Sequence, residues 1–147
     1  MPLKLKDISS YLSFAKKLSN TSEEILKKTP SNRIKINFKS DKSPVTKIDM
    51  AIERKLRSMI NKRFPNHGIF GEEYKNKTNN SPFLWVIDPI DGTKNFINGN
   101  NNFGTLISLC IDYTPVIGII NCPEIKKTWI GIRAVSYTHL TLPTNIG

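Results

Sequence analysis

The sequence predicts an α+β fold in which two N-terminal helices pack on a largely antiparallel sheet. Two observations support this prediction. Apolar residues recur at helical spacing in the first part of the chain, whereas short apolar runs separated by turn residues make up the last part. Because the helices come first and the strands follow one another directly, the helices should form a layer over the sheet.

Two apolar stripes define the helices. The first predicts a helix over residues 7–28, ending before Pro30, and the second a helix over residues 46–63, stopped by Pro65. The stripes are packing faces, to which we assign no chemical role. They consist of Ile8, Tyr11, Leu12, Ala15, Leu18, Ile25 and Leu26 in the first helix, and of Ile48, Ile52, Leu56, Met59 and Ile60 in the second.

The predicted strands occupy most of the remaining chain. Residues 33–38 form either a strand or an extended arm, and short apolar runs predict strands at residues 69–70 and 84–88. A short helix follows at residues 93–97. Turns and Asn/Gly loops then separate three further strands, at residues 104–112, 115–122 and 126–132.

The most informative motif is Asp88-Pro89-Ile90-Asp91-Gly92-Thr93, directly behind the apolar run at residues 83–87. In a tight turn, two carboxylates three residues apart repel each other, and a bound cation relieves this repulsion. Oxygen ligands favour Mg²⁺, then Mn²⁺ or Ca²⁺. Pro89 leaves the carbonyl of Ile90 free to turn toward the same centre. Gly92 and Thr93 offer backbone N–H groups to a phosphate at a helix start.

Each supporting motif has a simpler interpretation. Asp91-Gly92 is also a strong signal for a hairpin turn between residues 84–88 and a following strand. Glu72-Glu73, after Ile69-Phe70, is also typical of a solvated pair. Thr46 and Asp49 also form a capping box, which starts a helix without further function.

Three motifs that occur together, in one order, favour the metal-site interpretation over these simpler ones. Ser43-Pro44-Val45-Thr46-x-x-Asp49, Gly71-Glu72-Glu73 and Trp85-Val86-Ile87-Asp88-Pro89-Ile90-Asp91-Gly92-Thr93 resemble the signature of the inositol monophosphatase-like, metal-dependent phosphatases. The resemblance runs from about Ser10 to Gly131 and implies the N-terminal part of a layered α/β/α/β/α sugar-phosphatase fold. The histidinol-phosphatase branch is the most similar, through Gly92-Thr93-Lys94-Asn95-Phe96-Ile97-x-Gly99, Phe103-Gly104-Thr105-Leu106-Ile107-x-Leu109, Pro115-Val116-x-Gly118, Pro123 and Trp129-x-Gly131.

The resemblance also implies a role for each position of the motifs. The metal ions are expected to be two or three Mg²⁺, with Mn²⁺ as a substitute, and the substrate a small phosphorylated molecule. Histidinol phosphate is expected first, and inositol 1-phosphate or a related sugar or nucleotide phosphate is the alternative. The full-length form is expected to be a homodimer. The implied metal ligands are Glu72, Asp88, the Ile90 carbonyl and Asp91; the substrate-binding residues are Glu72, Asp91, Gly92 and Thr93; and the catalytic residues are Asp49 and Thr93, which orient the attacking water.

The same resemblance implies that a second half is needed. Chains of this family are considerably longer, and their second half carries a Trp-Asp motif whose Asp completes a metal site. Nothing similar follows Gly131 here. Residues 1–134 are therefore expected to be the metal-binding portion and to be inactive alone. Residues 135–147 contain no Asp, Glu, Lys or Arg, resemble read-through from a sequencing adapter, and are excluded from fold reasoning as a non-native tail.

Composition suggests one rival function. The formal net charge of +10 fits a basic, non-catalytic nucleic-acid-binding module. The basic residues are scattered along the sequence without interleaved aromatics, so we expect no nucleic-acid partner. A positive field would still attract an anionic phosphate ester.

The remaining sequence features predict a soluble, cytoplasmic protein without a membrane segment. The N-terminus lacks a long apolar core, and no apolar run approaches the length of a membrane span. Cys110 and Cys122 lie in apolar runs without metal-ligand spacing, and are expected to be reduced core thiols. His67 lies in a turn context and receives no function.

Overall fold

A computed structural model describes residues 5–29, 36–38, 44–78 and 80–133 of the chain. The tail at residues 135–147, Ser43 and the first part of the predicted arm at residues 33–35 lie outside the described residues. The elements are α1 (Leu5–Lys27), β1 (Ile36–Phe38), β2 (Pro44–Thr46), α2 (Lys47–Arg63), β3 (Gly68–Phe70), β4 (Phe83–Asp91), α3 (Thr93–Ile97), β5 (Gly104–Ile111), β6 (Thr114–Cys122) and β7 (Lys127–Ile132).

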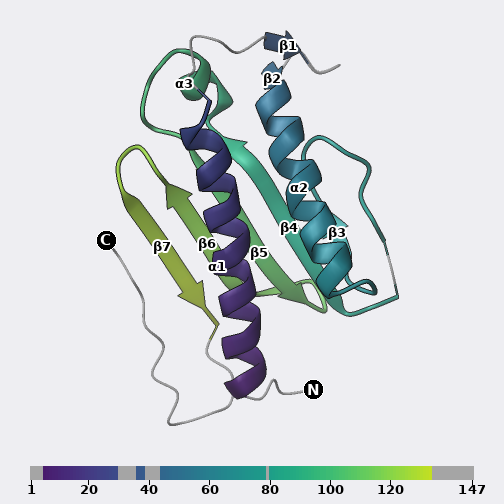
Figure 1. The fold of residues 1–147 in the computed structure, drawn as a ribbon. Helices are drawn as coiled ribbons and strands as arrows, with labels where there is room; N and C mark the ends of the chain where they lie inside the picture. The colour runs from purple at the N-terminus through teal and green to yellow at the C-terminus, as the bar shows by residue number, and fades with distance from the viewer. Residues whose placement is uncertain (1–4, 30–35, 39–43, 79, 134–147) are drawn as a thin grey trace.

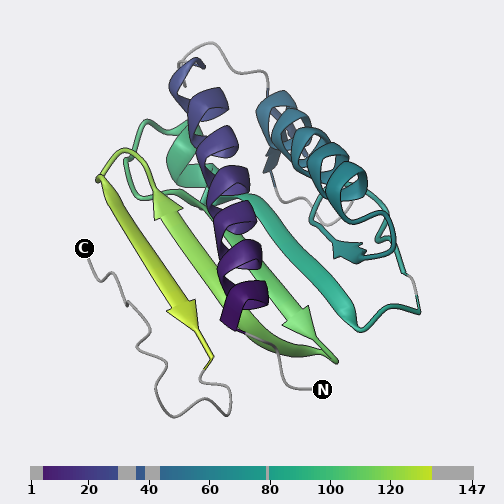
Figure 2. The same ribbon diagram turned by 60° about the horizontal axis from the view of Figure 1, so that its bottom comes forward.

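Five strands form the main sheet, in the spatial order β3-β4-β5-β6-β7. β3 and β4 are parallel, whereas every other neighbouring pair in this sheet is antiparallel. α1 and α2 lie side by side across one face of the sheet, with α2 over the β3 and β4 side (Figure 1, Figure 2). β1 and β2 form a separate antiparallel ribbon at the N-terminal end of α2 (Figure 1). The predicted α+β layer fold is confirmed.

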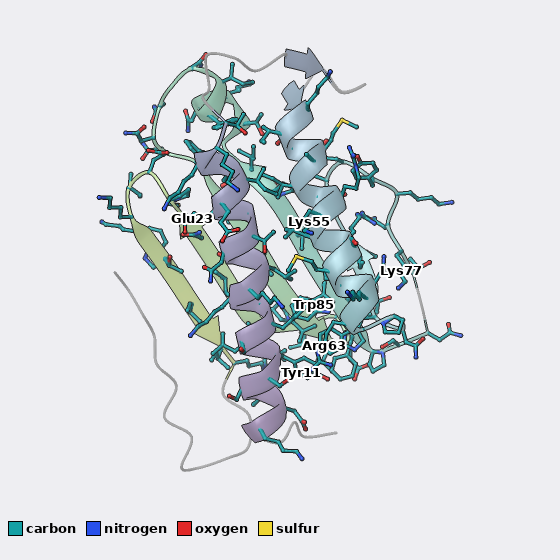
Figure 3. The ribbon with its side chains drawn as sticks, in the orientation of Figure 1. Tyr11, Glu23, Lys55, Arg63, Lys77 and Trp85 are labelled. Carbon is teal, nitrogen blue, oxygen red and sulfur yellow. The ribbon has the colours of Figure 1, made fainter. Side chains whose placement is uncertain are left out.

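The core fills the space between the two helices and the sheet. Alternate residues of β5 and β6 point toward the helices, and the helical stripes predicted from sequence meet them. Trp85 of β4 is fully buried and makes edge contacts with Phe14 of α1 (Figure 3). Burying one such large side chain contributes on the order of 2–3 kcal/mol. The fully buried aliphatic residues are Leu18, Ile52, Leu56, Ile60, Ile69, Ile87, Ile107, Leu109, Ile117 and Ile119.

His67 is a structural residue of this core. Its ring is stacked between Phe64 and Phe83, at centroid distances of 4.5 and 4.6 Å. Its Nδ1 accepts a hydrogen bond from the indole Nε1–H of Trp85 at 3.0 Å. Burial, followed by the positive charge of Lys77, lowers the pKa of His67 from 6.5 to about 4. The folded protein therefore holds this imidazole neutral at physiological pH.

Protonation of His67 should destabilise the fold. Because the folded pKa lies below the unfolded one, its contribution is fully present above pH 6.5 and is lost as the pH falls toward 4. The loss should reach at most about 3 kcal/mol, since each pKa unit corresponds to about 1.4 kcal/mol. Urea unfolding between pH 7 and pH 4 measures it. His67→Gln should show a clearly shallower pH dependence, and identical slopes for the two proteins would contradict this assignment.

The two cysteines differ in burial. Both are free thiols, but only Cys110 is buried, and Cys122 is half-buried at the end of β6. The expectation of core thiols is therefore right for Cys110 and wrong for Cys122. No helix among the described residues combines the length and apolar character needed to cross a membrane. The cytoplasmic location and the homodimer stay predictions.

Candidate active site

Parallel pairing of β3 with β4 places Glu72 beside Asp88. Phe70 pairs with Val86, and each carboxylate follows its paired residue by two positions, Asp88 within β4 and Glu72 just beyond the end of β3. Glu72 and Asp88 line one hollow of about 500 Å³, together with Val86 and residues of β5, β6 and β7. By the alternation along the strands, this is the face opposite to α1 and α2.

The motif that carries Asp88 and Asp91 is not a tight turn. β4 continues to Asp91, and an irregularity in its pairing with β5 falls between these two aspartates. The expectation that the strand ends at Asp88 is therefore wrong. Pro89 is tolerated because a proline fits a strand at a bulge, where no ladder hydrogen bond is lost.

Gly92 lies between the end of β4 and α3, as the N-cap of this helix. Its φ of 84° lies in the left-handed region, and a Cβ there would approach the carbonyl oxygen of Asn102 to 2.9 Å. The hairpin interpretation of Asp91-Gly92 is thereby excluded, because a helix and a loop separate β4 from β5. The backbone N–H groups of the first turn of α3 have no partner within the helix itself.

Thr93 links two elements that are far apart in sequence. Its Oγ1 lies 3.3 Å from Oδ1 of Asp49, in the first turn of α2, and 3.0 Å from the carbonyl oxygen of Ile90. The hydroxyl has one hydrogen, so it donates to only one of these acceptors at a time. Asp49 is 1% exposed. The structure thus brings Asp49, Thr93 and the carbonyl of Ile90 together in a polar cluster beside the end of β4.

The structure describes only part of the predicted capping box at the start of α2. α2 begins directly after Thr46, as the capping box requires, but the side chain of Thr46 lies outside the described residues. Asp49 has a hydrogen-bond partner 44 residues away in Thr93. A residue that only starts a helix has no need of that contact.

Asp91 is the last residue of β4. It is exposed, it pairs with Gly104 across the sheet, and it is not among the residues that line the hollow. Its charge acts on Cys122: burial raises the pKa of this thiol, and the negative charge of Asp91 raises it further. Thr105 supports the same segment by donating its hydroxyl to the carbonyl of Pro89 at 2.8 Å.

The donor chemistry of the predicted ligands fits a hard divalent cation. Glu72, Asp88, Asp91 and the Ile90 carbonyl offer only oxygen atoms, which Mg²⁺ and Mn²⁺ prefer. In the described part of the chain, however, no group of three His, Cys, Asp or Glu side chains is arranged so that it could hold an ion. These residues therefore supply the ligand chemistry of a metal centre without a complete set of side-chain ligands.

One supporting residue was missed from the sequence. Glu53 of α2 is fully buried and accepts backbone hydrogen bonds from the segment that carries Glu72. A signal was present, because Glu53 follows Asp49 by four residues and lies on the same helix face as the apolar stripe.

Four basic residues, one from α1 and three from α2, line a groove between these two helices. Lys17, Lys55, Lys62 and Arg63 line a hollow of about 850 Å³ that also includes Phe14. Figure 3 marks Lys55 and Arg63 on α2. This groove lies on the helical layer, whereas Glu72 and Asp88 open onto the opposite face of the sheet.

Comparison with known proteins decides the family. A sequence profile described as "Inositol monophosphatase family" matches residues 7–139. The chain belongs to the inositol monophosphatase family. Members of this family are phosphatases that depend on metal ions, typically Mg²⁺, and that act on small phosphorylated substrates.

Individual relatives agree with this membership. A chloroplastic bifunctional phosphatase of Arabidopsis thaliana is 38% identical over 136 residues, which are 90% of this chain and 39% of the relative. A histidinol-phosphatase of Mycobacterium tuberculosis is 36% identical over 100 residues, 68% of this chain and 38% of the relative. The solved IMPase of Thermotoga maritima superposes with a TM-score of 0.77 at 29% identity, covering 86% of this chain and 49% of that one. The chain thus spans half or less of the length of these family members.

Proposed function

We propose that the protein is the metal-binding portion of a Mg²⁺-dependent phosphomonoesterase. The observation that carries this proposal is the polar cluster made by Asp49, Thr93 and the Ile90 carbonyl at the end of the strand that bears Asp88. A buried carboxylate hydrogen-bonded to a hydroxyl at a strand end is suited to activating water. Phosphoryl transfer needs such positioning and charge neutralisation more than it needs a nucleophilic side chain.

Glu72, Asp88, Asp91 and the Ile90 carbonyl would hold the metal ions. When bound, divalent cations neutralise the charge of the phosphate and lower the pKa of water. The described carboxylates support this role by position, because Glu72 and Asp88 open onto one hollow at the end of two parallel strands. Further ligands would come from outside the described residues.

Asp49 and Thr93 would orient and deprotonate the attacking water. Asp49 accepts from the Thr93 hydroxyl, which leaves that hydroxyl's oxygen lone pairs available to accept a proton in turn. A threonine hydroxyl tied to a carboxylate is thereby able to relay a proton. Gly92 and Thr93 would meet the phosphate through their backbone N–H groups, at a turn whose left-handed conformation requires glycine.

The proposed substrate is L-histidinol phosphate. Support comes from the stretch Phe103-Gly104-Thr105-Leu106-Ile107 and from the similarity to the mycobacterial histidinol-phosphatase. Other relatives carry different names, among them a fructose-1,6-bisphosphatase/inositol-1-monophosphatase and a 3'(2'),5'-bisphosphate nucleotidase. Inositol 1-phosphate and nucleotide phosphates are therefore the alternative substrates.

Metal binding tests the proposal directly. Mg²⁺ or Mn²⁺ should raise the melting temperature of the chain, because an ion that binds only the folded state stabilises it by RT ln(1 + c/Kd), where c is the concentration of free ion. Thermal unfolding monitored by circular dichroism with and without the ion measures the rise. Asp91→Asn keeps the shape of the side chain and removes its charge, so most of the rise should disappear. An equal rise in this variant would remove Asp91 from the site.

Substrate preference tests the finer assignment. A full-length version should hydrolyse L-histidinol phosphate with a higher kcat/KM than inositol 1-phosphate or a nucleotide 3′-phosphate, since discrimination depends on how the leaving group is bound in the transition state. Phosphate release from the three esters under identical conditions gives the comparison. Preference for inositol 1-phosphate would reassign the substrate and leave the metal site unaffected.

A further inference from the structure

We propose that Glu53 is a positioning residue that fixes the backbone of the Glu72 segment, so that the Glu72 carboxylate is held beside Asp88 for an incoming cation. This inference rests on the proposed function, because it gives Glu72 the role of a ligand. It adds a residue of α2 to the site, although Glu53 itself contacts neither ion nor substrate.

Three backbone N–H groups converge on the Glu53 carboxylate. Oε1 accepts from the N–H of Glu72 at 2.8 Å and of Glu73 at 2.9 Å, and Oε2 accepts from the N–H of Tyr74 at 2.9 Å. A charged acceptor makes such bonds shorter and stronger than a neutral one does. β3 ends at Phe70, so this carboxylate replaces the sheet ladder as the acceptor for the following residues.

Arg57 completes the arrangement from the next turn of α2. Its Nε donates to Glu53 Oε2 at 2.9 Å, while its Nη1 and Nη2 donate to the backbone carbonyls of Lys75 and Tyr74. The fully buried charge of Glu53 is thereby paired and hydrogen-bonded, as a buried charge must be. Glu53 and Arg57 together hold residues 72–75 by hydrogen bonds to the N–H and carbonyl groups of the main chain.

Gly71 allows this close approach. A Cβ at position 71 would lie 2.5 to 2.7 Å from the three carboxylate atoms of Glu53, closer than real Cβ contacts. Any side chain there would force the segment away from Glu53. The glycine of Gly71-Glu72-Glu73 is therefore explained by a contact with α2.

The contacts of Glu53 are with the backbone of the segment that carries Glu72. Glu53 binds the backbone of residues 72–74, whereas the Glu72 side chain is exposed and lines the hollow together with Asp88. Groups that orient a metal ligand through such outer contacts alter metal affinity about 10- to 100-fold when they are changed. A purely structural Glu53 would change only stability, so metal affinity distinguishes the two roles.

The test is Glu53→Gln in the whole chain. Glutamine keeps the size of the side chain, but its amide nitrogen cannot accept a hydrogen bond. Hydrogen exchange of the backbone amides of Glu72, Glu73 and Tyr74, read by NMR without metal, should be at least about tenfold faster in the variant, since a lost acceptor removes protection. The Mn²⁺ Kd from electron paramagnetic resonance should rise about 10- to 100-fold.

Leu26→Ala is the matched control. Leu26 is buried in α1, so its truncation should lower the melting temperature while leaving the Mn²⁺ Kd and these amides unchanged. If Glu53→Gln does not fold, Gly71→Ala disturbs the same contact from the other side and should raise the Mn²⁺ Kd in the same direction. Wild-type Mn²⁺ affinity or unchanged amide exchange in Glu53→Gln would overturn the inference. Failure of the unsubstituted chain to bind Mn²⁺ would instead contradict the proposed function.

Discussion

Replacing Asp49 by Asn in a full-length version of this protein should lower kcat by about 10²-fold or more, the scale of a lost general-base contribution. The Asn side chain still offers an oxygen to the Thr93 hydroxyl, which lies 3.3 Å from Asp49 Oδ1, but it carries no charge to accept a proton. Steady-state phosphate release at saturating Mg²⁺ measures the effect. Metal affinity should stay close to that of the unsubstituted enzyme.

The same substitution decides between catalysis and helix capping. Asn is about as good as Asp at a helix N-terminus, so a merely structural Asp49 would be replaced with little loss of turnover. Thermal unfolding of the variant serves as the control, because a similar melting temperature shows that α2 is intact. Near-normal turnover in a folded variant would assign Asp49 to capping alone.

The sequence was sufficient for the elements that depend on local periodicity. α1, α2, β5, β6 and β7 end within about two residues of the predicted positions, because Pro30, Pro65 and the turn residues interrupt apolar patterns of clear period. The layer arrangement followed from the order of these elements. Glu72 could be placed just after a strand because it follows the short apolar run Ile69-Phe70, whereas the end of β4 was placed three residues too early, at Asp88.

Other features depend on contacts between distant segments, which no local pattern reveals. β4 extends through Pro89 to Asp91 because Gly104 of β5 pairs with Asp91. The place of Glu53 on the apolar helix face indicates burial, but its partners could not be predicted, since they are backbone groups 19 to 21 positions later. His67 became a core residue only because Phe64, Phe83 and Trp85 surround its ring.

The sheet face opposite to the helices carries an open hollow. Val86 of β4 is 38% exposed and Ile120 of β6 is 44% exposed, and both line the hollow that contains Glu72 and Asp88. An open hollow admits water, which weakens electrostatic contacts to a phosphate. The relatives named as phosphatases are at least about twice as long as the part that matches this chain.

The 147-residue chain alone should therefore show no Mg²⁺-dependent phosphate release above a Glu72→Gln control, even at saturating Mg²⁺. Its described carboxylates do not form a group of three, so charge developing on the phosphate would be only partly neutralised. The measurement is release of phosphate from L-histidinol phosphate and inositol 1-phosphate, with a full-length version as the positive control.

The exposed apolar face should also make the isolated chain associate or dissolve poorly, since a contiguous apolar surface favours contact between copies. Sedimentation velocity over a range of protein concentrations measures this association, and Ile120→Lys should reduce it by placing a charge on that face. The activity measurement tests whether the site is sufficient, whereas the association measurement tests the effect of the exposed apolar face. A monomeric chain would show only that the exposed face is tolerated in water. Clear Mg²⁺-dependent turnover that is lost in Glu72→Gln would show that residues 1–147 build a sufficient active site, and that no further ligands are required.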